Sequence, residues 1–338
     1  MTNAWHQLLS VAIHTPSPHN VQPWRIKIVN DVEAELYIDS TRTLPKEDTT
    51  GSFILSTMGM FIEAMTLLAR QRNMQISHEL VSEPETIASA VQLSTSPTLI
   101  PFAKLKIEAL DQPPLDIYDE ELFLKRRTSR LNLQDRKPSE ESIAALRRVA
   151  ERWRQHFHVT FDPSQIERIL EFNSAALFED LNSPEYHDEI VQWFRYTKGQ
   201  SSRSRDGLDA RCMNTWPVNY WIVANLPQLL RMPVTSQIMS AIYRRQIGCV
   251  PALGFISGSF WKPAEAINAG RFLMNFWLET TRQGLYIHPY GNLVTNRRAA
   301  DSVAQEVSQK DIWFVFKIGY SDEPPKSHRL SLEKILIP

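Results

Sequence analysis

The sequence predicts a fold that mixes helices and strands, and three observations lead to this prediction. Alternating apolar residues mark strands at 24–29 and 34–39, which are joined by a short turn. Apolar residues at helical spacing mark long helices at 52–72 and 263–282. The 11 glycines form neither a G-x-G-x-x-G nor a G-x-x-x-x-G-K-[ST] motif, so a Rossmann dinucleotide fingerprint and a P-loop are both missing.

The overall composition limits the classes of partner. The 338 residues are 43% hydrophobic and carry a formal net charge of −1, which is ordinary for a soluble protein. This balance gives no reason to expect DNA, RNA or an anionic membrane as a partner. Cys212 and Cys249 lie far apart without a CxxC motif, which argues against a zinc site and a disulfide scaffold and suits a reducing cytoplasm.

No targeting or membrane-spanning segment is expected. The first residues, MTNAWHQLLS, lack the basic start and the uninterrupted apolar stretch of a signal peptide. The most apolar run, 53–69, is short for a membrane span and contains Ser56, Thr57 and Glu63. It is therefore predicted to be a helix buried inside the protein.

The first part of the chain is predicted as helix, hairpin, helix and strand. Apolar residues at helical spacing predict a helix at 3–13, which ends at a proline-rich loop. A polar loop separates the hairpin from the helix at 52–72, and FAKLKIEAL at 102–110 alternates as a strand. The segment DQPPLD at 111–116 is the clearest linker signal in the chain.

Beyond that linker, helices and strands alternate. Ser139 is the predicted N-cap of a helix that runs to about residue 155, because Glu140 and Glu141 follow in its first turn. The polar run 198–212 has no periodicity and is predicted as a solvated loop, with a mobile cover over a site as the alternative. The other expected elements are a short helix at 117–126, a strand at 156–161, two or three helices within 164–198, a strand at 253–260, a helix at 263–282 closed by Gly284, a strand at 311–320 and a C-terminal tail across the surface.

A compact basic motif, RRTSR at 126–130, is the first candidate for ligand binding. Its arginines offer guanidinium forks and its threonine and serine offer hydroxyls, which are the donors that a phosphate monoester needs. The alternative is an ordinary charged helix end. Lys326 and Arg329 form a second basic point, which matters only if the fold brings it beside this motif. The motif comprises Arg126, Arg127, Thr128, Ser129 and Arg130.

A rigid polar loop at 14–24, HTPSPHNVQPW, is the second candidate. Its side-chain amides and hydroxyl offer neutral donors and acceptors, while three prolines stiffen the backbone. Such a loop suits the edge of a flat heterocycle. The alternative is a stiff turn that feeds a strand, with Trp24 in the core. The residues singled out are Pro16, Ser17, Pro18, His19, Asn20 and Gln22.

The segment GLYIHPYGN at 284–292 is the third candidate. A helix that ends at glycine, followed by an extended stretch and a Pro-Tyr-Gly turn, can lay backbone N–H groups against a planar ring. His288 precedes a proline and is more often structural than an acid–base group in such a position. No Gly-x-Ser-x-Gly elbow, HExxH motif or catalytic cysteine signature is present, so no catalytic side chain is assigned. Phosphate forks, an amide loop and a ring-sized turn together describe a phosphorylated flavin.

Two of these motifs resemble those of a known family. PSPHNVQPW resembles the P-S-x-x-N-x-Q-P-W motif of the FMN-dependent nitroreductase superfamily, and RRTSR resembles its R-x-[ST]-x-[RK] phosphate motif. The order of the motifs resembles the Acg-like branch, in which two nitroreductase-like halves are fused. RSRDGLD and FKIGYSDEPPKSHR add to the likeness. The resemblance implies an α+β fold with two nitroreductase-like halves, 1–112 and 113–338, in one chain as a pseudo-dimer.

The same resemblance implies roles for single residues. Arg126, Thr128, Lys326 and Arg329 would hold the phosphate and ribityl chain of FMN, and Arg130 would lie at the pyrimidine edge of the ring. Loop 14–24 would line the ring, and the turn at 289–292 would approach its N5 side, with glycine where many members have Glu. Since each half lacks a motif that the other has, one flavin site is expected, in a monomer (pseudo-dimer) or a homodimer. The implied cofactor contacts are Arg126, Arg127, Thr128, Arg130, Pro16, Ser17, Pro18, Asn20, Gln22, Pro289, Tyr290, Gly291, Asn292, Lys326 and Arg329.

The implied function is that of an FMN-dependent oxidoreductase. Hydride from NAD(P)H or from an organic substrate would pass to flavin N5, and a second small molecule would take the electrons. The alternative is a protein that stores or sequesters FMN, with the segment 198–217 as a lid over the flavin. A specialised biosynthetic dehydrogenase is a third possibility, and no metal is expected to take part.

Overall fold

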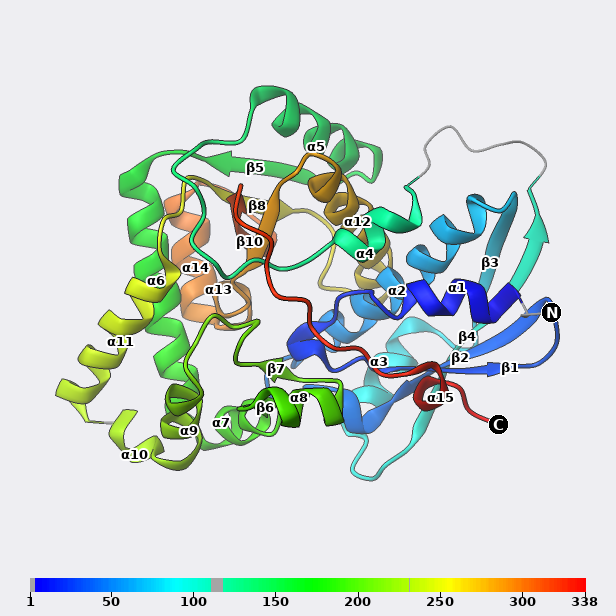
Figure 1. The fold of residues 1–338 in the computed structure, drawn as a ribbon, viewed down its shortest axis with the longest axis horizontal. Coiled ribbons are helices and arrows are strands. Elements are labelled where there is room, and N and C mark those ends of the chain that lie inside the picture. Colours follow the sequence, from blue (N-terminus) through cyan, green and yellow to red (C-terminus); the bar gives the residue numbers. More distant parts are fainter. Residues whose placement is uncertain (1–3, 111–117, 231) are drawn as a thin grey trace. The chain divides into compact units, whose positions relative to one another are not determined.

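The computed structural model describes residues 4–110, 118–230 and 232–338 and has the predicted α+β composition (Figure 1). The predicted linker at 111–116 lies outside the described residues. The helices are α1 (Ala4–Ala12), α2 (Ser52–Arg70), α3 (Pro84–Leu93), α4 (Glu120–Lys125), α5 (Glu140–Arg152), α6 (Pro163–Asn182), α7 (Pro184–Val191), α8 (Lys198–Ser204), α9 (Pro217–Asn225), α10 (Pro227–Leu230), α11 (Pro233–Ile247), α12 (Pro263–Arg282), α13 (Asn292–Thr295), α14 (Arg297–Glu306) and α15 (Leu332–Ile335). The strands are β1 (Trp24–Ile28), β2 (Glu33–Asp39), β3 (Met74–Leu80), β4 (Leu99–Ala109), β5 (His156–Thr160), β6 (Phe194–Arg195), β7 (Leu208–Asp209), β8 (Leu253–Ser257), β9 (Tyr286–Pro289) and β10 (Ile312–Gly319).

The chain forms two compact units that are interleaved along the sequence. Unit 1 contains Met1–Arg126, Phe260–Leu278 and His328–Pro338, and unit 2 contains Arg127–Ser259 and Glu279–Ser327. The predicted halves, 1–112 and 113–338, are each one continuous segment and do not coincide with these units. That they form a fused pseudo-dimer stays a prediction. Each unit has one four-stranded antiparallel sheet.

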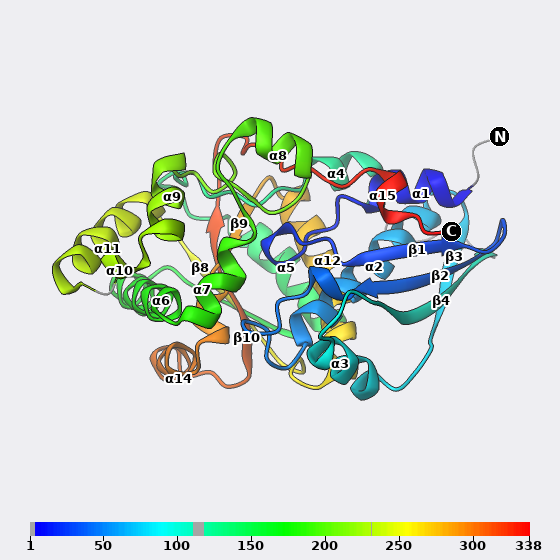
Figure 2. The same ribbon diagram turned by 90° about the horizontal axis from the view of Figure 1, so that it is seen from below.

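Unit 1 is built on the sheet β1-β2-β4-β3, with α1 and α2 packed together beside it (Figure 2). The predicted hairpin is present, and Trp24 pairs with Ile38 across it. Trp24 is fully buried and stacks on Phe61 of α2 with ring centroids 4.6 Å apart, so its prediction as a core residue is confirmed. α2 is long and apolar enough to cross a membrane, but 94% of its most apolar window is buried inside the protein, as the sequence predicted.

α2 and the first part of α12 approach each other through glycines. A Cβ atom on Gly59 would lie 2.0 Å from the carbonyl oxygen of Ile267, and one on Gly270 would lie 1.9 Å from that of Ser56. No side chain fits at either position, because these distances are shorter than any real Cβ contact. One turn away, Glu63 of α2 accepts hydrogen bonds of 2.9 Å from Arg271 and Asn275 of α12. The crossing is therefore fixed by backbone contact and by a buried charged group.

Unit 2 is built on the sheet β5-β8-β10-β9. Ser139 accepts a hydrogen bond from the backbone N–H of Ser142, so the predicted N-cap of α5 is confirmed. Buried Trp313 of β10 donates to Gln155 at 2.9 Å, which satisfies its indole N–H in the core. α6 packs against α11, α13 and α14 on one side of the unit (Figure 1).

The prediction of a solvated loop at 198–212 is wrong. The segment contains α8 and β7, and Ser201, Asp206 and Asp209 are buried in it. The charges of the segment can be buried because they are paired: Asp206 binds Arg195 at 2.7 Å, and Asp209 binds both Arg211 at 2.6 Å and the Ser201 hydroxyl at 2.7 Å.

The prediction of a surface tail is only partly correct. Leu330 and Ile335 are buried, and the backbone N–H of Ile337 donates to the carbonyl of Ile26 in β1. The sheet edge of unit 1 thus gains a bridge from the tail, between Ile26 and Leu336.

We expect that Gly270→Ala lowers the free energy of unfolding by about 2 kcal/mol, because the new methyl group would push α12 away from α2. Urea titration followed by circular dichroism measures this change. The matched control is Gly199→Ala in α8, where nothing lies within 4 Å of the added carbon and helix propensity favours alanine. Equal stability of the two variants would contradict the close helix crossing.

Candidate functional site

Arg126 is a buried cation in unit 1, and two of its nitrogens have no hydrogen-bond partner in the described part of the chain. It follows α4 and is 6% exposed, and its guanidinium lies over the ring of Trp277 at 4.7 Å from the centroid. Nη2 donates to the carbonyl of His14, whereas Nε and Nη1 are buried without a hydrogen-bond partner among the described residues. Burial first, and the positive charge of Arg329 second, lower the pKa of Arg126 to about 9. The group is thus still charged at neutral pH.

Arg329 connects this cation to the predicted amide loop. Nη1 of Arg329 donates to Oδ1 of Asn20 at 2.9 Å, and Nδ2 of Asn20 donates to the carbonyl of His328 at 3.1 Å. The sequence assigned Arg329 to a phosphate site only if the fold brought it beside the RRTSR motif; in the structure its positive charge lowers the pKa of Arg126, so the two charges interact. Two like charges that interact in a buried place are unfavourable unless an anion lies near them.

The amide loop holds an uncommon backbone conformation. His19, Asn20 and Gln22 have φ values of 45°, 56° and 54°, in the left-handed region that side chains usually avoid. Such residues cost of order 1–3 kcal/mol each unless the surroundings hold them. Here the Ser17 hydroxyl accepts from the backbone N–H of Gln22 at 3.0 Å. The loop is therefore preformed.

Gln22 was predicted to contact a flat ring of a ligand. In the structure its side chain is instead hydrogen-bonded within the protein. It is fully buried, its Oε1 accepts from the backbone N–H of Leu330 at 2.8 Å, and its Nε2 donates to the carbonyl of Asn20 at 3.3 Å. Both ends of this amide hold the loop and the C-terminal tail together. Pro16 is also buried, whereas Ser17, Pro18 and Asn20 are half-buried.

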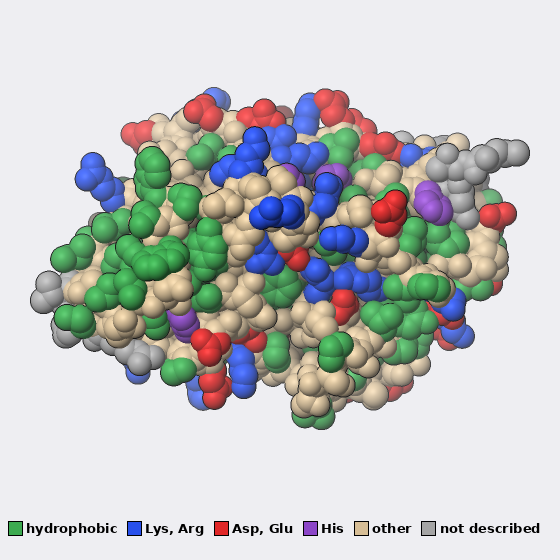
Figure 3. All heavy atoms as spheres, turned by 60° about the horizontal axis from the view of Figure 1, so that its bottom comes forward, with side chains coloured by type: hydrophobic (Ala, Val, Ile, Leu, Met, Phe, Trp, Pro, Cys, Tyr) green, Lys and Arg blue, Asp and Glu red, His purple; other side chains and the backbone are tan. Residues whose placement is uncertain are grey.

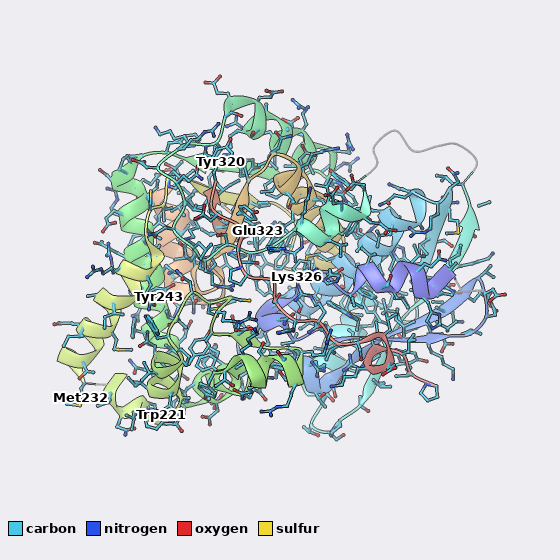
Figure 4. The ribbon with its side chains drawn as sticks, viewed as in Figure 1. Trp221, Met232, Tyr243, Tyr320, Glu323 and Lys326 are labelled. Carbon is cyan, nitrogen blue, oxygen red and sulfur yellow. The ribbon has the colours of Figure 1, made fainter. Side chains whose placement is uncertain are left out.

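The rest of the RRTSR motif belongs to unit 2 and runs along β9. Thr128 forms a bridge with Ile287, and the backbone N–H of Ser129 donates to the Ile287 carbonyl at 3.1 Å. Arg127 binds Glu323 at 2.5 Å and the carbonyl of Pro324 at 2.8 Å, so its predicted cofactor contact competes with a protein carboxylate. Figure 4 labels Glu323 on the segment that follows β10, with Lys326 further along it. Lys326 is exposed.

Arg130 is the centre of a second cationic group, in unit 2. Its positive charge acts on the pKa values of Tyr220, Tyr243 and Tyr290, so these three tyrosines lie near it. Nε of Arg130 and the hydroxyls of Tyr220 and Tyr290 are buried without a hydrogen-bond partner among the described residues. Burial raises the pKa of Tyr220 and of Tyr290, so both stay protonated and able to donate. Tyr220 and Tyr243 lie on α9 and α11, which were not among the predicted helices.

His288 and Lys317 lie opposite each other on β9 and β10 beside this group. Burial, followed by the charges of Arg130 and Lys317, holds the pKa of His288 well below its usual value, so the imidazole is neutral at neutral pH. Lys317 is fully buried and donates to the carbonyls of Leu131 at 2.9 Å and Ile247 at 3.0 Å. Burial first and Arg130 second lower its pKa to about 8.

In the predicted turn at 289–292, the hydroxyl of Tyr290 is buried and the side-chain amide of Asn292 is hydrogen-bonded to the protein. The backbone N–H of Tyr290 donates to the Val315 carbonyl, which fixes the turn to β10. Asn292 donates its side-chain amide to Asp180 of α6 at 2.8 Å, so that amide is already used. Gly291 has a φ of −56° and caps α13, a conformation open to other residues.

No three His, Cys, Asp or Glu side chains among the described residues lie together as a metal site. Neither cysteine forms a disulfide. The candidate residues of unit 1 are arginines and amides, and those of unit 2 are an arginine and tyrosines; each set suits an anionic group.

No protein-family model and no curated protein matches the sequence. Among solved structures, the FMN-dependent nitroreductase NfnB from Mycobacterium smegmatis, in complex with NADPH, is 16% identical with a TM-score of 0.38, over 64% of this chain and 95% of that chain. A nitroreductase with bound FMN from Desulfitobacterium hafniense is 13% identical with a TM-score of 0.37, over 64% and 95% of the two chains. A nitroreductase-like family protein from Bacillus cereus is 13% identical with a TM-score of 0.34, over 67% and 99%. At such low TM-scores the likeness alone does not assign a family, a cofactor or an activity to this chain.

The lowered pKa of Lys317 predicts how stability depends on pH. A lysine with a pKa of about 8 when folded and 10.5 as its ordinary value binds fewer protons in the folded state within that window. Its contribution to the free energy of unfolding therefore rises as pH rises from 8 to 10.5, by about 3 kcal/mol at most. The measurement is urea unfolding of the wild type and of Lys317→Met at intervals across this window. A difference between the two proteins that does not change with pH would show that Lys317 titrates normally.

Proposed function

We propose that the protein is an FMN-dependent oxidoreductase that takes electrons from NAD(P)H or from an organic substrate. The observation that carries the proposal is Arg126, a buried cation with two donors that have no hydrogen-bond partner among the described residues, and with a pKa that the charge of a second arginine, Arg329, helps to lower. A phosphate monoester is the ligand that fits such a group, since it accepts several charge-assisted hydrogen bonds and neutralises two positive charges. The resemblance of RRTSR and PSPHNVQPW to nitroreductase motifs selects the phosphate of FMN within that class.

The contacts within unit 1 support a site to which both predicted halves contribute. His14 and Asn20 belong to the predicted first half, and Arg126 and Arg329 belong to the second. The structure joins them by hydrogen bonds from Arg126 to His14 and from Arg329 to Asn20. This pairing favours one phosphate site that neither half forms alone, and with it the fused, Acg-like organisation.

When bound, FMN would supply hydride transfer between an electron donor and an acceptor. The residues of the chain would hold the phosphate with Arg126 and Arg329 and would keep the amide loop preformed. Arg130 keeps its predicted role at the edge of the ring that becomes negative on reduction. Tyr290 stays protonated and His288 stays neutral, so neither side chain brings an opposing charge to that edge.

One observation favours FMN storage as the second candidate function. The segment 198–217, the predicted lid, contacts Arg130 directly: Cys212 offers its carbonyl to Nη1 at 3.4 Å, and Asn214 donates to the carbonyl of Arg130 at 3.2 Å. The buried ion pairs of Asp206 and Asp209 fix the same segment. A cover held in this way would keep a nicotinamide ring from reaching the flavin.

Anaerobic reduction separates the two functions. An oxidoreductase is expected to be yellow as purified and to lose its flavin absorbance when NADH or NADPH is added without oxygen. A storage protein is expected to bleach only with dithionite. A colourless protein that does not bind added FMN would overturn both proposals.

We expect that Arg126→Ala weakens FMN binding about tenfold to a hundredfold, because the charge-assisted bonds of one guanidinium to phosphate are lost. Fluorescence titration of the apoprotein with FMN measures the dissociation constant, and riboflavin, which lacks the phosphate, should lose no affinity. The matched control is Arg168→Ala, which removes an arginine from a surface ion pair with Glu306. Full flavin retention by the double variant Arg126→Ala, Arg130→Ala, with circular dichroism unchanged, would show that the phosphate assignment is wrong.

A further inference from the structure

The helices α9, α10 and α11 of unit 2 expose an unusual number of large hydrophobic side chains. Figure 3 shows hydrophobic side chains gathered over these helices, with basic and acidic side chains at the edges of the group, and Figure 4 labels two of the residues, Trp221 and Met232. Trp216 is 74% exposed and Trp221 is 51% exposed. We name this group the α9–α11 face; it comprises Trp216, Val218, Trp221, Met232, Ile238 and Ile242.

The exposure is not explained by a poor core in this region. Met239 and Tyr243 of α11 and Val223 of α9 pack against Phe178 and Leu181 of α6. Tyr220 of α9 stacks on Phe194 with ring centroids 4.1 Å apart. Both helices therefore have an inward apolar side that is satisfied and a second apolar side that faces outward. An outward side of this kind marks a binding surface.

The stretch of sequence that carries this face has basic residues and no acidic ones. The acidic side chains beside it lie on α6, where Glu167 and Glu171 pair with Arg244 of α11. The stretch 210–264 contains neither Asp nor Glu, although the whole chain has 38 acidic residues. The same stretch contains basic residues, of which Arg245 is exposed in the last turn of α11. Exposed cations of the neighbouring segment 198–205 add to this charge: Lys198, Arg203 and Arg205. The net charge of −1, from which no membrane partner was expected, averages over this local excess.

We propose that the α9–α11 face docks on an anionic lipid surface. Tryptophan rings are enriched at the membrane–water boundary, where an apolar ring with a polar edge fits best. Exposed apolar residues beside cations on short helices are the features of an element that lies in that boundary, and anionic lipids attract the cations. The proposal does not depend on the function proposed above.

A second copy of the chain suits this face less well than a lipid surface. In a twofold dimer the same patch meets itself, so the cations of one copy would face those of the other. The stretch 210–264 offers no carboxylate to pair with them. Anionic headgroups supply the negative charge that the face itself lacks.

Vesicle co-sedimentation of the full chain tests the proposal. The probes are vesicles of phosphatidylcholine alone and vesicles with about 30% phosphatidylglycerol. We expect binding to the anionic vesicles only, with loss of binding at about 0.5 M salt, where surface charges are screened. We expect Trp216→Ser, Trp221→Ser to weaken binding at least about tenfold, because two interfacial anchors are removed. The matched control is Val29→Ser, Val32→Ser, which removes two exposed apolar side chains from the hairpin of unit 1.

Several results would overturn the proposal. One is wild-type protein that does not sediment with anionic vesicles at low salt; another is a tryptophan double variant that binds as tightly as the wild type. A dimer in gel filtration that the double variant dissociates, with no vesicle binding, would make the face a contact between copies. If the double variant does not fold, Trp216→Ser alone and Arg245→Gln serve instead, because both side chains are exposed. Unchanged vesicle binding by both of these variants would equally reject the face.

Discussion

The close crossing of α2 and α12 is the constraint on which unit 1 depends. Because Gly59 and Gly270 carry no side chain, the backbones of the two helices come into direct contact, and residues 260–278 become part of a unit otherwise built from the N-terminal segment and the tail. The same helix carries Trp277, whose ring lies against Arg126. The surroundings of Arg126, which we propose to bind a phosphate, thus depend on a backbone contact between two helices far apart in sequence.

The burial of Arg126 and Arg329 makes the folding free energy of unit 1 less favourable. Burying a guanidinium with two unsatisfied nitrogens beside another cation opposes folding, and the strained amide loop adds to that cost. Any anion that binds only the folded chain repays part of it through mass action. At Arg126 this cost fits the ligand site proposed above, because two of its nitrogens have no hydrogen-bond partner among the described residues.

Periodicity predicted the elements with strong amphipathic or alternating patterns, such as the first hairpin, α2, α5, α12 and β10. It did not predict β3, α3 or α9–α11, whose patterns are weaker. It also wrongly predicted a solvated loop at 198–212, because the ion pairs that allow Asp206 and Asp209 to be buried are visible only in the folded structure. For the candidate site, the sequence identified the arginines but not the residues that surround them in the fold. Arg126 and Arg329 are two hundred positions apart, and only tertiary structure shows that they interact.

The interleaved path of the chain affects how the protein is made. Unit 1 needs His328–Pro338, where Leu330 binds Gln22 and Ile337 binds Ile26, yet the ribosome delivers these residues after all of unit 2. Segments that emerge first from the ribosome usually fold first. Unit 1 is an exception, because its synthesis begins before that of unit 2 and ends after it. During translation the edge of β1 therefore stays open until the C-terminal tail, which bridges it in the finished fold, has been made.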